Sequence, residues 1–172
     1  KLLIDNSADL NLRDWIQNTA LHLASQGHKK DHKDIVELLI SKKADIDSKG
    51  YRGQTPLHMA IHQQRISIAN WLIYKGAEVN IADNFGDRPL HLAKTKEAAQ
   101  LLISKGAVVT LKNDKGQSVL WNETYDFPKK LDLIEYLISA GADVNAKDDD
   151  GDTPLDWINV DDVDSEETAD LL

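Results

Sequence analysis

The chain of 172 residues contains no cysteine, which excludes a disulfide framework and a metal site built from thiolates. No apolar run approaches the roughly 18 residues that a membrane-spanning helix needs, and no signal-peptide pattern is present at the start. These absences favour a reducing compartment. We therefore expect a cytoplasmic protein that does not contact membranes, while the sequence leaves open that the natural N-terminus is missing.

Sequence patterns typical of catalysis are also missing. The chain has no nucleophile elbow, no phosphate-binding glycine loop, no His-Glu-x-x-His motif and no dinucleotide fingerprint. We therefore expect no enzymatic activity and no cofactor in this segment. Any activity of the natural protein would then reside in other parts of it.

Basic residues are missing from the C-terminal end. Residues 148–172 contain 11 Asp or Glu and no Lys or Arg. Residues 1–147 hold 20 basic and 18 acidic residues, a net charge of +2. An almost neutral body with an acidic end would repel phosphates, so we expect no nucleic-acid binding. A partner protein with basic segments remains compatible with this charge distribution.

What the chain does contain is an internal repeat. A Leu-His-x-Ala phrase recurs at 21–24, 57–60 and 90–93, and a Gly-Ala-x-Val phrase recurs at 76–79, 106–109 and 141–144, with a weaker version at 43–46. The most regular unit is 50–82, with 33 residues. Self-similarity at such a period is the signature of a solenoid built from stacked units.

The period of 33 residues and the Thr-Pro-Leu-His-x-Ala phrase at 55–60 make the chain resemble the ankyrin repeat family over essentially its whole length. The resemblance implies an all-α solenoid of helix-turn-helix units with projecting hairpin or turn fingers. It also implies a non-catalytic scaffold that binds other proteins, and we expect a monomer. As a single domain 1–172, the chain divides into a partial repeat 1–13, repeats 14–49, 50–82, 83–112 and 113–147, and a partial repeat 148–172.

Each unit follows the same local rules. Thr55 is a good N-cap, and Pro56 stands at the first helical position, where its missing N–H costs nothing. Gly76 ends the second helix in the left-handed conformation. The first repeat carries Gln17 and Lys43 where glycines are expected, so both are predicted to be left-handed at a cost of roughly 1–2 kcal/mol each.

Histidines recur in equivalent positions of successive units. The resemblance implies that His22, His58 and His91 are structural and bond the capping residue and the neighbouring backbone. Their spacing of 33 to 36 residues places them in different units and not around one point, which disfavours catalysis or metal binding. Trp121 and Asp156 replace this histidine in the last two units.

Two clusters were considered as metal sites. His28 and His32 are four residues apart with acidic neighbours, a spacing that could hold zinc on a helix, but they lie in a lysine-rich insertion without a clear fourth ligand. The acidic run 148–152 suggests calcium, yet alignment to an EF-hand loop places Ala146 and Trp157 at ligand positions. We expect no metal at either cluster.

The finger tips and the exposed face of the first helices are the candidate binding surface, because ankyrin repeats bind proteins there. Three aromatic residues stand at successive tips, and acidic residues follow. The alternative is that these rings fold back onto neighbouring fingers. The candidates are Trp15, Tyr51, Arg52, Gln54, His62, Gln63, Phe85, Asp87, Asp114, Lys115, Tyr125, Asp149 and Asp150, with Gln26 and Asn122 added along the helix face. We expect a partner with an apolar and a basic segment.

Two other functions remain open. The chain could be a targeting or regulatory domain of a larger enzyme or effector, or a reader of basic or methylated-lysine peptides through aromatic and acidic groups. Separately, Leu137 lies eight residues before Asn145, a spacing that resembles the site read by asparaginyl hydroxylases on ankyrin proteins. Asn145 is therefore a candidate modification site.

Overall fold

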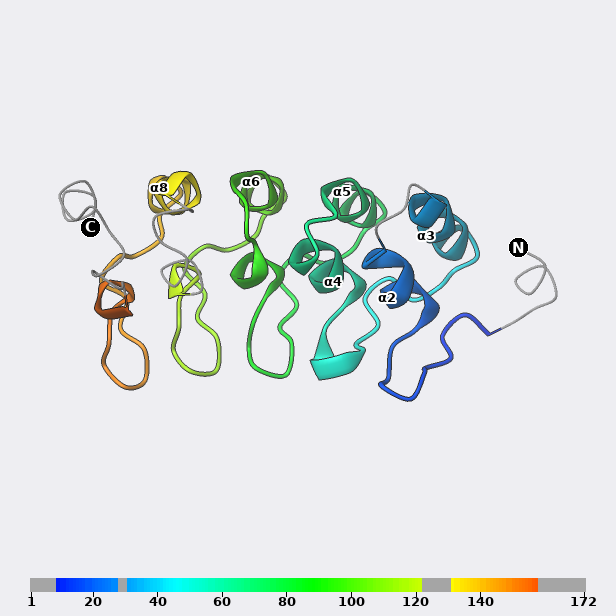
Figure 1. The fold of residues 1–172 in the computed structure, drawn as a ribbon, viewed down its shortest axis with the longest axis horizontal. Coiled ribbons are helices and arrows are strands. Elements are labelled where there is room, and N and C mark those ends of the chain that lie inside the picture. The colour runs from blue at the N-terminus through cyan, green and yellow to red at the C-terminus, as the bar shows by residue number, and fades with distance from the viewer. Residues whose placement is uncertain (1–8, 28–30, 122–130, 158–172) are drawn as a thin grey trace.

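The computed structural model describes residues 9–27, 31–121 and 131–157, and it shows a row of short helices joined by loops (Figure 1). The helices are α2 (Ala20–Ser25), α3 (Asp31–Ser41), α4 (Pro56–His62), α5 (Ile66–Tyr74), α6 (Lys96–Ser104) and α8 (Leu131–Ser139), and the 3-10 turns are η1 (Tyr51–Gly53), η2 (Pro89–Leu92) and η3 (Pro154–Trp157). None of these helices is long and apolar enough to cross a membrane.

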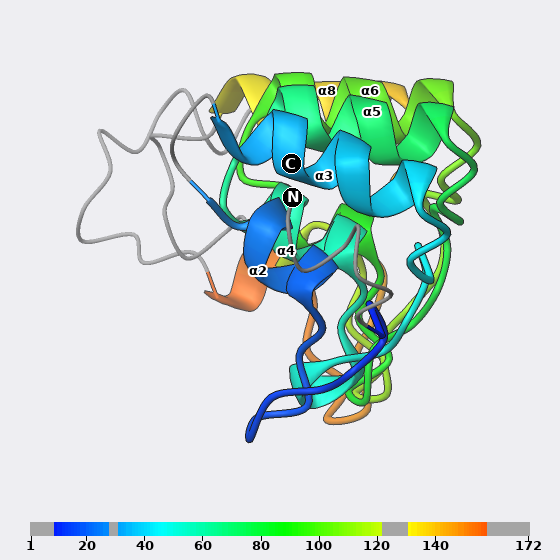
Figure 2. The same cartoon turned by 90° about the vertical axis from the view of Figure 1, so that its right-hand side faces the viewer.

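The elements form two layers with a set of projecting loops. The longer helices α3, α5, α6 and α8 make an outer row, while α2, α4, η2 and η3 make an inner row (Figures 1 and 2). Neighbouring elements contact one another in both rows. In the inner row α2 contacts α4 and α4 contacts η2; in the outer row α3 contacts α5, α5 contacts α6 and α6 contacts α8. Loops, here called fingers, project from the inner row away from the outer helices (Figure 2). Within the described ranges no strand is formed, so the fingers are turns and not hairpins.

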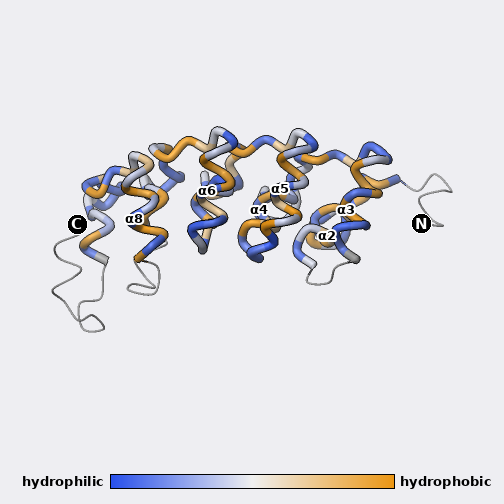
Figure 3. The backbone as a smooth tube through the Cα atoms, turned by 90° about the horizontal axis from the view of Figure 1, so that it is seen from above, coloured by the Kyte–Doolittle hydropathy of each residue, from blue (hydrophilic) through white to orange (hydrophobic). Residues whose placement is uncertain are grey.

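The core follows the repeat. In Figure 3 hydrophobic and hydrophilic stretches alternate along every unit. Leucines of the inner row (Leu21, Leu57, Leu90 and Leu120) and of the outer row (Leu39, Leu72, Leu102 and Leu137) are all buried. Because one helix pair cannot cover these side chains alone, the pairs stack and share one continuous core. The all-α solenoid expected from the sequence is therefore confirmed.

Local sequence explains where the inner elements begin and end. Thr55 caps α4, its hydroxyl oxygen accepting the His58 backbone N–H at 3.4 Å, and Pro56 is the first helical residue. The shorter third repeat has room only for the single turn η2 before Thr95 caps α6. The three missing residues have thus shortened the inner row and left the outer helix intact.

The left-handed residues lie where the sequence predicted them. Lys43 has φ of 67° and Gln17 has φ of 71°, and the glycines that end the other outer helices have φ between 90° and 100°. Left-handed backbone crowds a Cβ atom against the following carbonyl, so the two side-chain-bearing residues destabilise the first repeat.

Exchanging Lys43 for glycine is expected to stabilise the chain by about 1 kcal/mol, because the backbone keeps its conformation and loses the crowding. For a domain of this size the melting temperature should rise by roughly 2–4 °C, measured by circular dichroism. The reciprocal exchange Gly106→Lys is the matched control, since Gly106 has φ of 90° and no atom in the described part of the chain lies within 4 Å of its Cβ position. It should lower the melting temperature by a similar amount. An unchanged or lower melting temperature for Lys43→Gly would contradict this account.

Candidate functional site

The repeated histidines join each unit to the next. The backbone N–H and the hydroxyl of Thr55 lie 3.1 and 2.8 Å from His58 Nδ1, and Nε2 donates to the carbonyl of Asp87 in the next finger at 3.1 Å. His22 is bonded in the same way, with its Nε2 donating to the Gln54 carbonyl at 3.0 Å. Burial lowers the pKa of His58 to about 4 and also lowers the pKa of His22 and His91. These are neutral structural histidines, as the sequence predicted.

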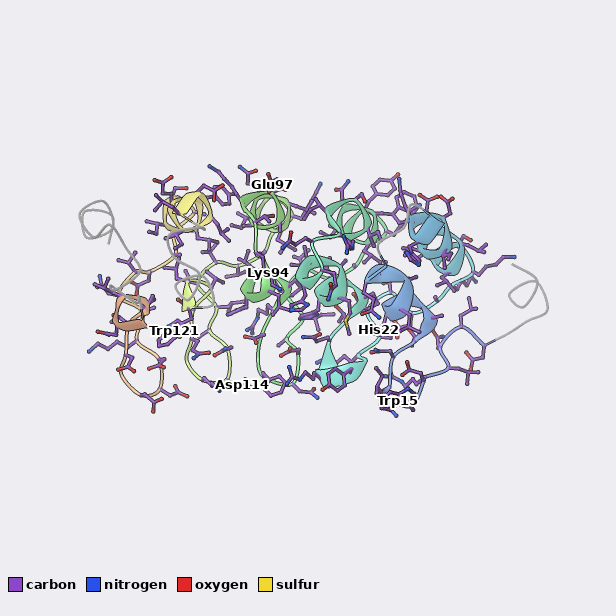
Figure 4. All side chains as sticks on the ribbon, in the orientation of Figure 1. Trp15, His22, Lys94, Glu97, Asp114 and Trp121 are labelled. Atoms are coloured by element: carbon purple, nitrogen blue, oxygen red, sulfur yellow. The ribbon has the colours of Figure 1, made fainter. Side chains whose placement is uncertain are left out.

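The units without this histidine replace it differently. Asp156 accepts from the backbone N–H and the hydroxyl of Thr153 at 2.7 and 2.8 Å, so a carboxylate takes over the capping contacts. These hydrogen bonds lower the pKa of Asp156. Trp121 is buried and fills the corresponding place in the fourth unit with an apolar ring (Figure 4).

Neither suspected metal cluster gains support. Asp148 uses one carboxylate oxygen to accept the N–H groups of Asp150 and Asp152, both at 3.0 Å, which makes a turn. The ring of His32 packs against Gly27, and His28 lies outside the described residues. Over residues 9–27, 31–121 and 131–157, no three His, Cys, Asp or Glu side chains come together as metal ligands would.

Each finger is a turn of five residues closed by backbone hydrogen bonds. The first residue donates to the carbonyl of the fifth in 14–18, 50–54, 83–87, 113–117 and 148–152, at 2.8 or 2.9 Å. In addition, the backbone carbonyl of the third residue accepts the backbone N–H of the second residue of the next finger. These bonds are Arg52 from Asn84 at 2.9 Å, Phe85 from Asp114 at 3.0 Å, and Lys115 from Asp149 at 3.0 Å. The first finger is joined by a side chain instead, because the Tyr51 N–H donates to Asn18 Oδ1 at 2.9 Å. The fingers thus form a hydrogen-bonded row, which fixes the spacing of their tips.

The aromatic tips differ in how far they are covered. Trp15 is 91% exposed, whereas Tyr51 and Phe85 are 48% and 45% exposed. The guanidinium of Arg52 lies 5.6 Å from the Tyr51 ring and 5.0 Å from the Phe85 ring, so one cation joins two tips. Phe85 stands one turn position later than Trp15 and Tyr51, and this shift brings it to Arg52. Arg52 therefore partly covers the Tyr51 and Phe85 rings without burying them, while Trp15 stays exposed.

A pocket of about 440 Å³ opens beside Phe85, and it is lined by Arg52, Asn84, Phe85, Asp87, Asn113, Asp114, Lys115 and Gln117. It contains both cations and carboxylates. Asp114, Asp149 and Asp150 are exposed and continue the row toward the acidic end. Figure 4 shows Trp15 and Asp114 at the finger ends, far from Glu97 on the outer row. We call the exposed tips of 14–18, 50–54, 83–87, 113–117 and 148–152 the finger surface.

Two of the sequence candidates serve mainly to connect fingers. The amide of Gln54 donates to a carboxylate oxygen of Asp83 at 3.3 Å, and Asp87 accepts from the Asn113 amide at 2.9 Å. Both side chains are only half exposed. Their contribution to the finger surface is to hold neighbouring fingers in position.

On the inner row, His62 is exposed beside Gln63 at the end of α4. The Lys94 ammonium donates to His62 Nε2 at 3.3 Å, and burial together with the charge of Lys94 lowers the pKa of His62. Lys94 lies in the inner layer because η2 is so short (Figure 4). This lysine is not among the residues predicted from the sequence, although its position in the shortened repeat was a signal. Gln26 is half-buried after α2.

Two candidates, Tyr125 and Asn122, lie outside the described residues. Asn145 is exposed and its backbone N–H donates to Asp143 at 2.9 Å, while Leu137 is buried. Asn80 has the equivalent place in an earlier repeat, and its side chain bonds Gly106 and Val108 of the next unit.

The stacked helix pairs and the hydrogen-bonded fingers define the class of the molecule, which is a repeat solenoid. Family models described as ankyrin repeats match residues 1–83, 29–113 and 128–157. The chain belongs to the ankyrin repeat family, whose repeats are generally protein–protein interaction modules.

Proteins of very different kinds contain stretches similar to this chain. The chain is 35% identical over 152 residues to a putative palmitoyltransferase ZDHHC13 of Danio rerio, a match covering 86% of this chain and 23% of that protein. It is 37% identical over 105 residues to serine/threonine-protein kinase 12 of Arabidopsis thaliana, covering 60% and 21%. It is 31% identical over 125 residues to human neurogenic locus notch homolog protein 1, covering 70% and 5%. The chain thus spans less than a quarter of these relatives.

Proposed function

We propose that this chain is a non-catalytic interaction module that binds a protein segment along the finger surface. The observation that carries the proposal is the exposure of Trp15, Tyr51 and Phe85 on successive fingers. Exposed aromatic rings contribute little to the stability of a solenoid, yet they are favoured anchors where proteins bind one another. The hydrogen-bonded finger row holds these rings in place before a partner arrives, which reduces the entropy lost on binding.

The chemistry of the partner follows from the order of the tips. The apolar end at Trp15 would bind an aliphatic or aromatic side chain of the partner. The end at Asp114, Asp149 and Asp150 would bind a lysine or arginine of the partner. The described fingers extend over adjacent units whose helices pack roughly 8–10 Å apart, so an extended or helical segment can contact all of them. Nucleic acid would be repelled by the acidic end, and we propose a monomer acting in the cytoplasm.

Display of a random peptide library tests the proposal. Selection on the full chain should enrich peptides with an apolar residue at one end and basic residues at the other. The triple variant Trp15→Ala, Tyr51→Ala and Phe85→Ala should bind these peptides at least about 30-fold more weakly, as the loss of interface anchors worth 2 kcal/mol or more implies.

Val108→Ala is the matched control, because it removes an exposed apolar side chain that lies outside the fingers and leaves them unchanged. It should leave peptide binding unaffected. Both variants should keep a melting temperature close to that of the parent, since none of the altered side chains is buried. Undiminished peptide binding by the triple variant would refute the proposal.

A second candidate is that the module serves a larger enzyme. It is favoured by the relatives named as a putative palmitoyltransferase and a protein kinase, in which the matched part is under a quarter of the protein. In that case the fingers would select or position a substrate protein for a separate catalytic domain. The natural sequence on either side of residues 1 and 172 would decide this directly.

A reader of methylated lysine has less support in the structure. Such a reader needs free aromatic faces, and Arg52 lies against both the Tyr51 and the Phe85 ring. A ligand cation would have to displace this arginine. Recognition of unmodified basic residues by the carboxylates farther along the row needs no such displacement.

A further inference from the structure

The outer row carries one feature that the repeats do not explain. In α3, α6 and α8 the last residue is a serine whose hydroxyl donates to the carbonyl three residues earlier: Ser41 to Leu38 at 2.7 Å, Ser104 to Leu101 at 2.8 Å, and Ser139 to Tyr136 at 2.7 Å. This bond satisfies a carbonyl at the helix end. The corresponding residue of α5 is Tyr74, which is 74% exposed. In the repeat 50–82, a large exposed ring thus stands where the other outer helices have a small capping residue.

Three residues earlier α5 carries a second departure, Trp71, where α3 and α6 have leucine. The Trp71 and Tyr74 rings stack with their centroids 5.4 Å apart and their planes 25° apart. The Lys75 ammonium lies 4.4 Å from the Trp71 ring and 5.0 Å from the Tyr74 ring. Leu72 fills the fully buried position of the helix, and Trp71 packs against the core while staying partly exposed. Tyr74 has no such role in the core, because most of its surface is exposed.

The pair stands beside a groove of about 550 Å³ between α3 and α5. Asp34, Glu37, Leu38 and Ile40 line it from α3, and Trp71 and Lys75 line it from α5. Aliphatic side chains and the indole provide apolar walls, and among the lining residues two carboxylates stand against one ammonium. Outside the lining, the Lys33 ammonium lies 6.0 Å from the Trp71 ring. Lys33 lies 3.7 Å from Glu37, an exposed ion pair that contributes little to stability and can be exchanged at little cost.

We propose that this outer groove is a second protein-binding site that takes an arginine next to an aliphatic residue from a partner protein. The aliphatic side chain packs on Trp71 and Leu38, and the guanidinium reaches the carboxylates of Asp34 and Glu37. Arginine fits better than lysine, because its planar guanidinium pairs with carboxylates through two parallel hydrogen bonds. Tyr74 extends the aromatic wall beyond the groove. The site faces away from the finger surface, so both sites can be occupied together (Figures 1 and 4).

The probe is a synthetic peptide of alternating arginine and leucine, compared with one in which glutamate replaces every arginine. The chain has four tryptophans, so its indole N–H region in a nitrogen–proton correlation spectrum holds few signals, and Trp71→Phe assigns the one of interest. The arginine peptide should shift the Trp71 signal saturably, and the glutamate peptide should not.

Tyr74→Ser introduces the residue found at the end of the other outer helices, so the variant should fold normally. It should bind the arginine peptide at least about tenfold more weakly. The double variant Asp34→Asn and Glu37→Gln should weaken binding of the arginine peptide by a similar factor. The finger variant Trp15→Ala, Tyr51→Ala and Phe85→Ala should leave the Trp71 shift intact, which separates this site from the finger surface. No Trp71 shift, an equal shift with glutamate, or full binding by Tyr74→Ser would overturn the proposal.

Discussion

Lowering the pH from 7 to 5 is expected to destabilise the folded chain by about 2 kcal/mol through His58 alone. Burial lowers the pKa of this imidazole to about 4 in the folded state, against 6.5 in an unfolded chain. Between these values the unfolded state binds the extra proton and the folded state does not, so stability falls as pH falls. The structural reason is that Nδ1 must stay unprotonated to accept from Thr55 while Nε2 donates to the Asp87 carbonyl.

Urea denaturation at several pH values measures this effect, with His58→Gln as the comparison. The variant is expected to be less stable at pH 7, because it loses the bonds that join two units, but its stability should change less between pH 7 and pH 5. His22 and His91 have lowered pKa values in the same direction and remain in both proteins, so the difference between the two slopes reports His58. Identical slopes for the parent and the variant would contradict the assignment.

Much of the fold could be predicted from the sequence because its signals are local and repeated. The Thr55-Pro56 start and the left-handed Lys43 each depend on a few neighbouring residues, and the structure confirms them. The histidines could be understood because their copies fall in equivalent places of successive units. The fingers were expected as hairpins or turns, and within the described residues they are closed turns.

The candidate site was harder to predict because it depends on contacts between units. The sequence placed aromatic rings at three tips but could not show that Arg52 lies against two of them. Likewise Lys94 meets His62 only because η2 is one turn long. The pair Trp71 and Tyr74 went unnoticed, although aligning the ends of the outer helices would have revealed the missing serine.

The finger row itself can be tested at Gly86. Gly86→Ala is expected to cost about 3 kcal/mol of unfolding free energy, from two sources. The backbone there has φ of 75°, which a Cβ atom makes unfavourable by roughly 1–2 kcal/mol. The new methyl group would also collide with the backbone nitrogen of Asp114 in the next finger, an overpacking that adds about 1–3 kcal/mol. Urea denaturation followed by circular dichroism measures the loss.

Gly151→Ala separates these two sources. Gly151 has φ of 89°, so its substitution carries the same backbone cost, but no atom of the described residues lies within 4 Å of its Cβ position. We expect it to cost about 1 kcal/mol, and the difference of about 2 kcal/mol then measures the close contact between fingers. Equal losses would mean that the fingers are not packed against one another. A large difference would show that Phe85 and Asp114 stand on a rigid row, which is what a preformed binding surface requires.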